Sequence, residues 1–369
     1  MENLRAVQAV AGASVETLAV VKANGYGHDA ALVARVLVGA GVRWLGVSDV
    51  EEGARVRAEV GLEPRVLVMC GMEVVDSREV MEQDLTPVVW TVEQVEALEV
   101  AAEVAGKRVR VHLEIDTGMA RQGVDLEGLG RVAERLAGLR SVVCEGVMSH
   151  LSSAESVVSE VTFEQRKKFA RALEVVVEHG LRPKWVHLGN TSAVDEGSTM
   201  RWVCEMAERV AARAMVRTGL ALYGHCLPLD TGVAGELAAR VRPVLTWKTR
   251  VIGVREIRAG ATVGYGATFV AKSLMRLALL PVGYADGWRR AGSSGMGNGW
   301  VRIAGQRAAV VGRVSMNLTV VDVTDIAGVA AGDEVVLLGE GVSAEDHARW
   351  CGTIAYDILC GIRAKFRVI

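Results

Sequence analysis

The sequence predicts an α/β protein in which an N-terminal (β/α)8 barrel precedes a mainly β C-terminal domain. Three observations support this. The 369 residues exceed what one ordinary hydrophobic core holds. Between residue 17 and about residue 223, short β-branched runs alternate with amphipathic segments of roughly ten to fifteen residues. Beyond that point the runs become β-rich and are punctuated by glycine, which is typical of antiparallel sheets.

Eight strand candidates occur in the first part of the chain. In order they are TLAVV (17–21), WLGVS (44–48), RVLVMC (65–70), TPVVW (86–90), VRVHLEID (109–116), VCEGVMSH (143–150), KWVHLG (184–189) and AMVRTG (214–219). Helix-like stretches such as 29–41 and 163–180 separate them. Eight parallel βα units close most economically as a barrel, and barrel active sites lie at the C-terminal ends of the strands. We expect the site there.

The second part of the chain predicts an antiparallel domain. Its β-rich runs include RLALLPVGYADGW and DEVVLLGE, and it ends in an amphipathic stretch, 347–362, that predicts helical structure. We expect a barrel over residues 1–230 and the β-rich domain over 231–369.

Composition narrows the classes of function. The chain carries 42 basic and 44 acidic side chains, a net charge of −2, so no nucleic-acid partner is expected. No apolar run is long enough to span a bilayer, and the start MENLRAVQ does not resemble a signal peptide, so we expect a cytoplasmic protein without a membrane partner. Six scattered cysteines form no C-x-x-C pair, so free thiols and no metal site are expected.

Polar residues gather at the ends of the predicted strands. They are Lys22 and Tyr26 after the first strand, Arg121 after the fifth, His150 after the sixth, Asn190 and Thr191 after the seventh, and Arg217, Gly219 and Leu220 at the eighth. Each alone also fits an ordinary role, such as a lysine that reaches solvent or a buried core histidine. Barrels commonly hold a phosphate after strands seven and eight. A phosphate facing a lysine suits pyridoxal 5'-phosphate, whose aldehyde forms a Schiff base with lysine.

Eight motifs carry a resemblance to a known family. They are AVVKANGYGHD, DTGMARQG, MSHLSSAE, HLGNTSA, VRTGLALYG, VGYGAT, PVGYADG and GRVSMN. In this order and across nearly the whole chain they resemble the alanine racemase family. Family members have a further strand upstream of NLRAV that joins the second domain, whereas this sequence starts at Met1.

The resemblance implies a pyridoxal phosphate-dependent racemase that interconverts L- and D-alanine, a precursor of peptidoglycan. Lys22 would be one catalytic base, and Tyr265 of the partner subunit the other. Two bases are needed because a proton leaves one face of a planar carbanion and returns to the other. The implied assembly is a homodimer with shared active sites, acting on a small amino-acid substrate.

The remaining roles are also implied by the resemblance. Arg217 would face the pyridine nitrogen and, through His150, tune Tyr265. Arg121 would contact the cofactor's phenolic oxygen and the substrate carboxylate. The phosphate would be held by Tyr26, Thr191, Gly219, Leu220 and Tyr356, with Asn190 beside them. Tyr284 and Met316 of the partner subunit would bind the carboxylate end of the substrate, although either alone also fits simple packing.

Two departures from the family pattern keep alternatives open. Glu114 replaces the usual lysine before DTGM, and Asn317 replaces the usual aspartate after Met316. They keep a serine racemase or a racemase of wider range as alternatives. A non-catalytic pyridoxal phosphate-binding protein is a further alternative, against which the motif VGYGAT argues. We expect Glu114 to face inward and to orient Arg121 by a hydrogen bond; the alternative is a surface ion pair.

Overall fold

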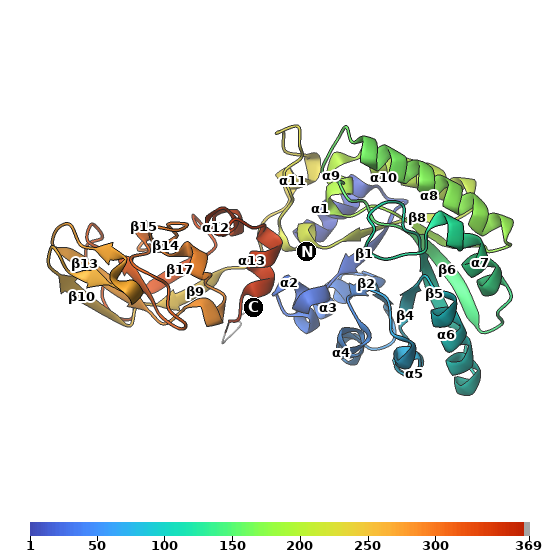
Figure 1. Ribbon diagram of the computed structural model, residues 1–369, viewed down its shortest axis with the longest axis horizontal. Coiled ribbons are helices and arrows are strands. Elements are labelled where there is room, and N and C mark those ends of the chain that lie inside the picture. The colour runs from blue at the N-terminus through green and yellow to red at the C-terminus, as the bar shows by residue number, and fades with distance from the viewer. Residues whose placement is uncertain (365–369) are drawn as a thin grey trace. The chain divides into compact units, whose positions relative to one another are not determined.

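A closed barrel of parallel strands forms the N-terminal unit of the computed structural model, which describes residues 1–364 (Figure 1). Each strand pairs with the next, and the last pairs back with the first. The strands are β1 (Glu16–Val20), β2 (Trp44–Val47), β3 (Arg65–Val68), β4 (Thr86–Val89), β5 (Val109–Glu114), β6 (Val142–Met148), β7 (Trp185–His187) and β8 (Arg213–Thr218). All eight predicted strands are confirmed, and so is the fold class.

The barrel strands are buried on both faces, which explains why they read as nearly continuous apolar runs. All five residues of β1 are buried, and so are all four of β2. One face of each strand packs inside the barrel and the other packs under the helices, so apolar residues predominate on both.

Helices surround the barrel (Figure 1). They are α1 (Glu2–Ala11), α2 (Lys22–Tyr26), α3 (Ala30–Gly39), α4 (Val50–Val60), α5 (Ser77–Glu82), α6 (Val92–Ala105), α7 (Leu126–Ala137), α8 (Glu160–Glu178), α9 (Thr191–Glu196), α10 (Ser198–Arg209) and α11 (Glu236–Arg240), with short 3-10 turns η1 (Val74–Asp76) and η2 (Leu220–Tyr223). Side chains of Asp49, Thr91, Asp125 and Ser159 cap α4, α6, α7 and α8. Every helix in the described part of the chain, residues 1–364, is too short or too polar to span a bilayer.

The two units divide between Arg242 and Pro243. The sequence-based boundary, between residues 230 and 231, lies within a segment that packs on the barrel. Helix α11 contacts α1 and α9, and the Asp195 carboxylate accepts the backbone N–H of Leu237 at 2.8 Å. Asn3 accepts the backbone N–H of Arg242 at 2.9 Å. These contacts join residues far apart in sequence, which local composition does not reveal.

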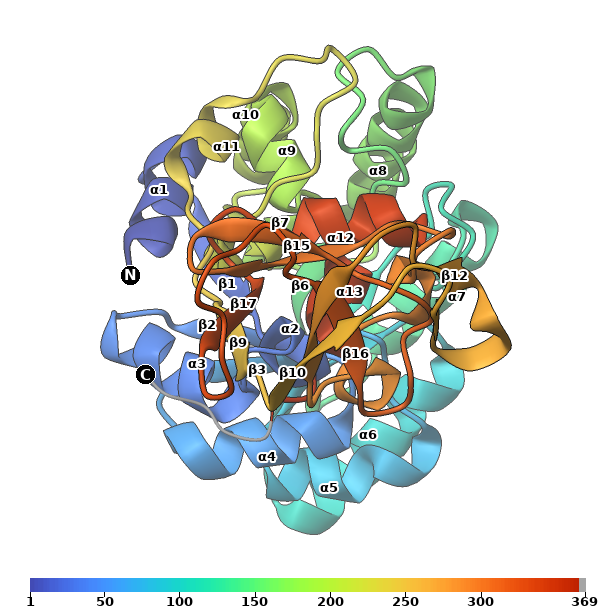
Figure 2. The ribbon, with the colours of Figure 1, turned by 90° about the vertical axis from the view of Figure 1, so that its left-hand side faces the viewer.

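The C-terminal unit is built from small antiparallel sheets (Figure 2). Its strands are β9 (Trp247–Arg250), β10 (Gly253–Ile257), β11 (Thr262–Val263), β12 (Phe269–Val270), β13 (Met275–Leu280), β14 (Trp300–Ile303), β15 (Gln306–Ala309), β16 (Thr319–Asp322) and β17 (Glu334–Leu338), with 3-10 turns η3 (Tyr265–Ala267), η4 (Tyr284–Asp286) and η5 (Arg290–Gly292). Sheets of order β10-β13-β16 and β15-β14-β17-β9 accompany a β11-β12 ribbon. The predicted mainly β domain is therefore confirmed.

The predicted helical stretch over 347–362 is confirmed, with a break inside it. The structure has two helices there, α12 (Ala344–Cys351) and α13 (Ala355–Gly361). Gly352 separates them with φ of 63°, a left-handed conformation that ends α12. Glycine adopts this conformation without a steric penalty, so it is a common helix terminator.

Candidate active site at the barrel mouth

Lys22 follows β1 directly and opens a turn with the opposite hand to an ordinary helix. In α2, φ is 54° at Ala23, 54° at Asn24, 62° at Gly25 and 53° at Tyr26. A left-handed conformation costs an L-residue other than glycine about 1–2 kcal/mol. Such backbone strain persists only where surrounding contacts enforce it, and it concentrates at functional sites. The sequence prediction of a turn here is confirmed, but its hand was not foreseen.

Arg217 is the centre of a buried hydrogen-bond network at the end of β8. Its side chain is 5% exposed. Nη2 donates to the carbonyl of Ser149 at 2.8 Å and lies 3.0 Å from Nδ1 of His150. Nη1 donates to the carbonyl of His187 and also lies 3.1 Å from its Nδ1. The guanidinium group is thereby held by the last residue of β7 and by the two residues that follow β6.

This network determines which nitrogen of each histidine carries a proton. Arginine has only donors, so Nδ1 of His150 and of His187 accept, and their protons reside on Nε2. Nε2 of His187 lies 2.8 Å from Nδ1 of His112 and donates to it. The His112 proton then lies on Nε2, for which residues 1–364 provide no hydrogen-bond partner. Burial lowers the pKa of His112 to about 3 and that of His187 well below its ordinary value, so both rings are neutral at physiological pH.

Three cationic side chains surround His150. Burial, followed by the positive charges of Arg217, Arg121 and Lys22, lowers the pKa of His150 to about 3. Arg217 still carries its charge, since burial lowers its pKa only to about 10 while the Glu114 carboxylate opposes that shift. The structure therefore brings Lys22, Arg121, His150 and Arg217 into one electropositive region suited to an anionic ligand.

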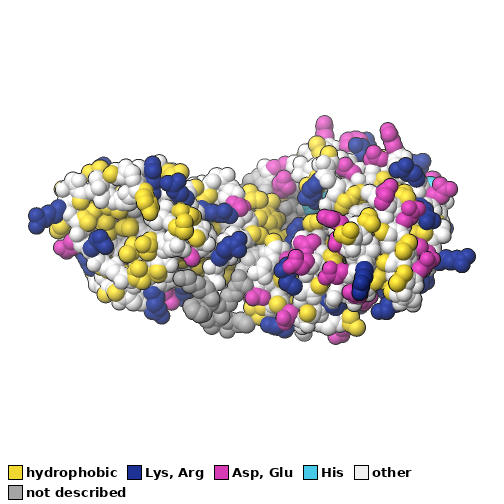
Figure 3. Space-filling model, turned by 60° about the horizontal axis from the view of Figure 1, so that its bottom comes forward, with side chains coloured by type: hydrophobic (Ala, Val, Ile, Leu, Met, Phe, Trp, Pro, Cys, Tyr) yellow, Lys and Arg dark blue, Asp and Glu magenta, His cyan; other side chains and the backbone are white. Residues whose placement is uncertain are grey.

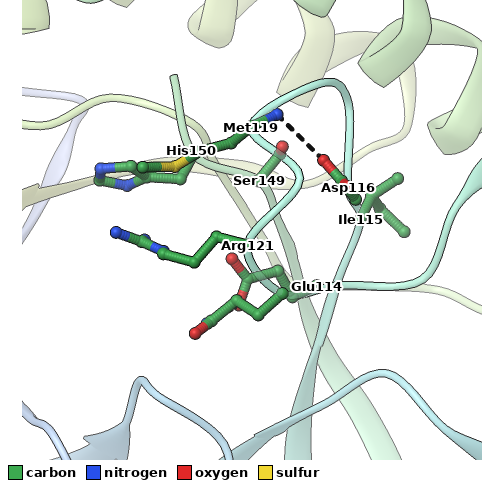
Figure 4. Close-up of a pocket in the computed structure, with 8 residues that line it drawn as sticks. Glu114, Ile115, Asp116, Met119, Arg121, Ser149 and His150 are labelled. Atoms are coloured by element: carbon green, nitrogen blue, oxygen red, sulfur yellow. Dashed lines mark hydrogen bonds between the residues drawn. The ribbon is translucent and has the colours of Figure 1, made fainter. Parts of the chain in front are cut away.

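A pocket opens beside the ends of β5 and β6 (Figure 4). Its lining residues are Glu114, Ile115, Asp116, Met119, Arg121, Gln122, Ser149 and His150. The Arg121 and His150 side chains extend to the same side in this view. The loop that carries Arg121 is shaped by Asp116, whose Oδ1 accepts three backbone N–H groups, those of Gly118, Met119 and Ala120, at 2.9–3.1 Å.

Glu114 faces inward, as predicted, and is 2% exposed. Within residues 1–364, its carboxylate accepts a hydrogen bond from Gln122 rather than from Arg121, which corrects the expected partner. Nε2 of Gln122 also donates to the carbonyl of Met69 at 2.9 Å. Burial raises the pKa of Glu114, and the Gln122 hydrogen bond and the charges of Arg217 and Arg121 oppose that rise. Glu114 is thus a buried acidic group facing the two arginines.

A second cluster of site residues forms around Gly219. A Cβ atom at this position would lie 2.3 Å from the hydroxyl of Tyr26, so only glycine permits the approach. The Tyr26 ring stacks on Tyr223, with centroids 4.9 Å apart. Oγ1 of Thr191 lies 3.3 Å from that of Thr218 and accepts the N–H of Ala221 at 3.4 Å. The hydroxyl groups of Tyr26, Thr191 and Thr218 thus lie close to the backbone around Gly219. The next residue, Leu220, is buried.

Asn190 caps a helix beside this cluster. Its Oδ1 accepts the backbone N–H of Ala193 at 3.1 Å and so caps the start of α9. This cap fixes the position of Thr191, the next residue.

The other predicted site residues lie on the C-terminal unit. Tyr265 stands at the tip of the β11-β12 ribbon, where Gly264 approaches the backbone of Arg313. The backbone N–H of Tyr284 donates to Ser315 at 3.1 Å, and Ala285 donates to Met316 at 2.9 Å. One segment, residues 312–316, therefore links all three positions. Tyr356 lies in α13 and is half-buried.

Three of these side chains are unusually exposed. Tyr265 is 68%, Tyr284 43% and Met316 57% exposed. Figure 3 shows further hydrophobic side chains gathered on the visible face of the C-terminal unit. Exposed apolar groups that gather in this way mark surfaces that bind another surface or a ligand.

Sequence reasoning missed several supporting residues. His112, His187 and Gln122 hold Arg217 and the Arg121 loop through the bonds described above. Gln165 of α8 donates to the carbonyl of His150 at 2.9 Å. The alternation of β5 and β7 placed His112 and His187 on buried strands, but nothing in the sequence indicated that they contact each other.

Comparisons with known proteins identify the family that this chain matches. The alanine racemase N-terminal domain model matches residues 1–226, and the C-terminal domain model matches 244–369. Alanine racemase of Symbiobacterium thermophilum is 37% identical over 367 residues, covering 98% of this chain and 92% of the relative.

Two solved structures extend the comparison. The crystal structure of alanine racemase from D-cycloserine-producing Streptomyces lavendulae has a TM-score of 0.88 and 32% identity, covering 99% of this chain and 92% of that one. The structure of alanine racemase from Bartonella henselae with covalently bound pyridoxal phosphate has a TM-score of 0.85 and 26% identity, covering 100% and 96%.

Proposed function

The chain belongs to the alanine racemase family, and on that premise we propose that it is a pyridoxal 5'-phosphate-dependent racemase that interconverts L- and D-alanine. We further propose that it acts as a homodimer in which Tyr265 of the partner subunit completes each barrel site. The observation that carries the proposal is the placement of Lys22 in one electropositive region with Arg121 and the buried Arg217.

The residues present fit pyridoxal phosphate. Lys22 supplies the amine for its aldehyde, and the hydroxyls around Gly219, where a Cβ would collide with Tyr26, fit a phosphate group. Thr191, Leu220 and Tyr356 would share the phosphate, and Asn190 would position Thr191. When bound, this cofactor withdraws electrons from the substrate α-carbon so that the α-proton becomes acidic.

Arg217 would determine which reaction is favoured. Its guanidinium is a donor that stays protonated, so a ring nitrogen opposite it accepts a hydrogen bond and remains neutral. A neutral ring withdraws electrons less strongly than a protonated one. Arg217 therefore favours simple return of the proton over side reactions such as transamination.

Lys22 and Tyr265 of the partner subunit would move the proton on opposite faces of the α-carbon. A free tyrosine has a pKa of about 10 and is a poor base at neutral pH. Neutral His150, with its proton on Nε2, can donate to the tyrosine oxygen and stabilise its deprotonated form. Arg121 would hold the substrate carboxylate, and Tyr284 and Met316 of the partner subunit would enclose it.

Solvent-deuterium uptake tests this proposal. The full chain with added pyridoxal phosphate is incubated in deuterium oxide with a panel of L-amino acids, with Lys22→Ala as the control. We expect α-deuteration of alanine and formation of the D-enantiomer, both absent in the control. Faster exchange of serine or of many amino acids would instead establish a wider racemase. No exchange of any amino acid would establish a non-catalytic binding protein.

The presence of the C-terminal unit supports a catalytic role. Residues 244–369 match the family's C-terminal domain, which carries Tyr265 in the motif VGYGAT. A protein that only binds the cofactor has no need of a second acid–base group.

A further inference from the structure

The left-handed turn after Lys22 needs an external restraint, because several of its residues hold a conformation that L-amino acids avoid. The turn has its own hydrogen bonds: Gly27 donates to Ala23 at 3.1 Å, His28 to Gly25 at 2.9 Å and Asp29 to Asn24 at 3.0 Å. Short isolated turns of this kind do not persist on such bonds alone.

Glu52 of the neighbouring βα unit supplies a bond from outside the turn. Its Oε1 accepts the backbone N–H of Asn24 at 2.9 Å. Its Oε2 accepts both the backbone N–H of Ser48 at 2.9 Å and the Ser48 hydroxyl at 2.7 Å. Glu52 is only 5% exposed although its side chain ends in a carboxylate. One oxygen is therefore anchored at the end of β2, and the other holds the turn that follows β1.

The position of Glu52 suits a fixed negative charge. It lies in the first turn of α4, where the helix dipole favours a carboxylate, and its own backbone N–H is capped by Asp49 at 2.8 Å. A carboxylate held in this way accepts stronger hydrogen bonds than a neutral group does. The Lys22 turn is thus attached to a rigid element rather than to another loop.

We propose that Glu52 is a positioning residue that holds the left-handed turn closed and thereby keeps Lys22 at the barrel mouth. The effect on the turn is independent of the reaction, whereas an effect on turnover rests on the proposed function. If the turn opens, Lys22 loses its defined direction relative to Arg217 and His150. The hydrogen bonds of its carboxylate go to Asn24 and Ser48, so it acts on Lys22 through the turn.

Amide hydrogen exchange of the full chain tests this role. Glu52→Ala removes both acceptors, and Glu52→Gln leaves a single oxygen for which Asn24 and Ser48 compete. We expect the amides of Gly27, His28 and Asp29 to exchange at least tenfold faster in Glu52→Ala and by a smaller factor in Glu52→Gln. With pyridoxal phosphate and alanine, kcat should fall more than KM changes.

The matched control is Glu16→Gln, another buried carboxylate of the barrel, 8% exposed and paired with Arg43 at the opposite end of β1. It should reduce stability without changing exchange in the turn. Ala23→Gly tests the mechanism further, since Ala23 is exposed and glycine tolerates its φ of 54°. In the Glu52→Ala background it should restore part of the lost protection.

Two results would overturn the proposal. One is unchanged exchange of residues 27–29 in Glu52→Ala or, should that variant not fold, in Glu52→Gln. The other is equal acceleration by Glu16→Gln, which would mean that only general stability was lost. Failure of the proposed function is a separate outcome, because normal protection of the turn without deuterium uptake by alanine would leave Glu52's role intact.

Discussion

The barrel mouth and the C-terminal unit present their site residues in opposite ways. Arg217 is 5% exposed and bonded to groups at the end of β7 and directly after β6. Tyr265, from the C-terminal unit, is 68% exposed at the tip of a two-stranded ribbon. The barrel side chains are therefore held in place before any ligand binds, and the C-terminal side chains are displayed for contact with something else.

The difference has a physical reason. A group that must stay charged or keep one tautomer needs bonds from several sides, and only a buried site provides them. A group that completes a site from another surface must be exposed until that surface arrives. This reasoning supports a site assembled from two subunits.

Mixing two inactive variants tests most directly whether the exposed Tyr265 completes the barrel site of the other subunit. Lys22→Ala lacks a barrel base and Tyr265→Phe lacks the displayed base, so each alone should have almost no activity. After subunit exchange, a dimer of one of each has one intact site, so about a quarter of the normal activity should return. If subunit exchange is verified and no activity returns, each site uses the Tyr265 of its own chain.

Tyr265→Phe should also act unequally on the two enantiomers. Loss of a positioned acid–base group typically costs about 10²–10⁴ in rate. Because Lys22 still serves its own face, α-deuterium exchange should fall by that factor for one enantiomer and much less for the other. Equal small losses for L- and D-alanine would contradict the two-base assignment.

Gly219→Ala tests how rigid the barrel side is. The added Cβ would lie 2.3 Å from the Tyr26 hydroxyl, so the tyrosine or η2 must move. We expect the dissociation constant for pyridoxal phosphate to rise about tenfold or more, measured by absorbance titration. Gly39→Ala, where a Cβ meets nothing within 4 Å, is the control and should bind normally. Equal affinities would mean that this cluster does not hold the cofactor.

Acid should destabilise the barrel more than the C-terminal unit. Burial lowers the pKa of His112 and His150 to about 3 and that of His187 well below its ordinary value, whereas the C-terminal unit has only His347, whose pKa burial lowers to about 4. These rings are easier to protonate in the unfolded chain, so stability falls as pH drops from about 6.5 toward 4, by up to about 1.4 kcal/mol per pH unit for each ring.

Unit-resolved hydrogen exchange across this pH range measures the effect. His187→Asn should make the pH dependence of the barrel shallower and leave that of the C-terminal unit unchanged. Identical slopes for the two units would show that the buried histidines do not control acid stability.

Glu114→Gln should have the smallest effect. The substitution removes a buried acidic group facing Arg121 and Arg217 but keeps an oxygen that can accept from Gln122. We expect KM for alanine to rise severalfold while cofactor affinity stays normal. Glu145→Gln, a buried carboxylate paired with Arg65, is the control. Unchanged kinetics in Glu114→Gln would mean that the charge does not orient Arg121.

Much of the barrel site was predictable because parallel strands follow a general rule. Buried strands such as β1 and β2 leave nearly continuous apolar runs, and the residues directly after them must meet at one end of the barrel. Lys22, His150 and Arg217 were identified in this way, and the structure brings them together. The partner contact of Tyr265 came only from the family resemblance and stays a prediction.

The supporting residues could not be found in the same way. Glu52 contacts Asn24 across 28 positions, and His112 contacts His187 across 75. Each contact depends on how elements that are not adjacent in sequence pack in the closed barrel, which local patterns do not report. The break at Gly352 is different, since a glycine within an amphipathic stretch was a signal available in the sequence.

The sequence by itself determined the order of strands and helices, the presence of two domains and the residue types at the strand ends, because periodicity and turn chemistry are local properties. Tertiary structure decided the hand of the Lys22 turn, the tautomers imposed by Arg217 and the partner of Glu114. Those features arise where side chains from different βα units meet in a buried space, and there the requirement that every polar group find a partner selects the final arrangement.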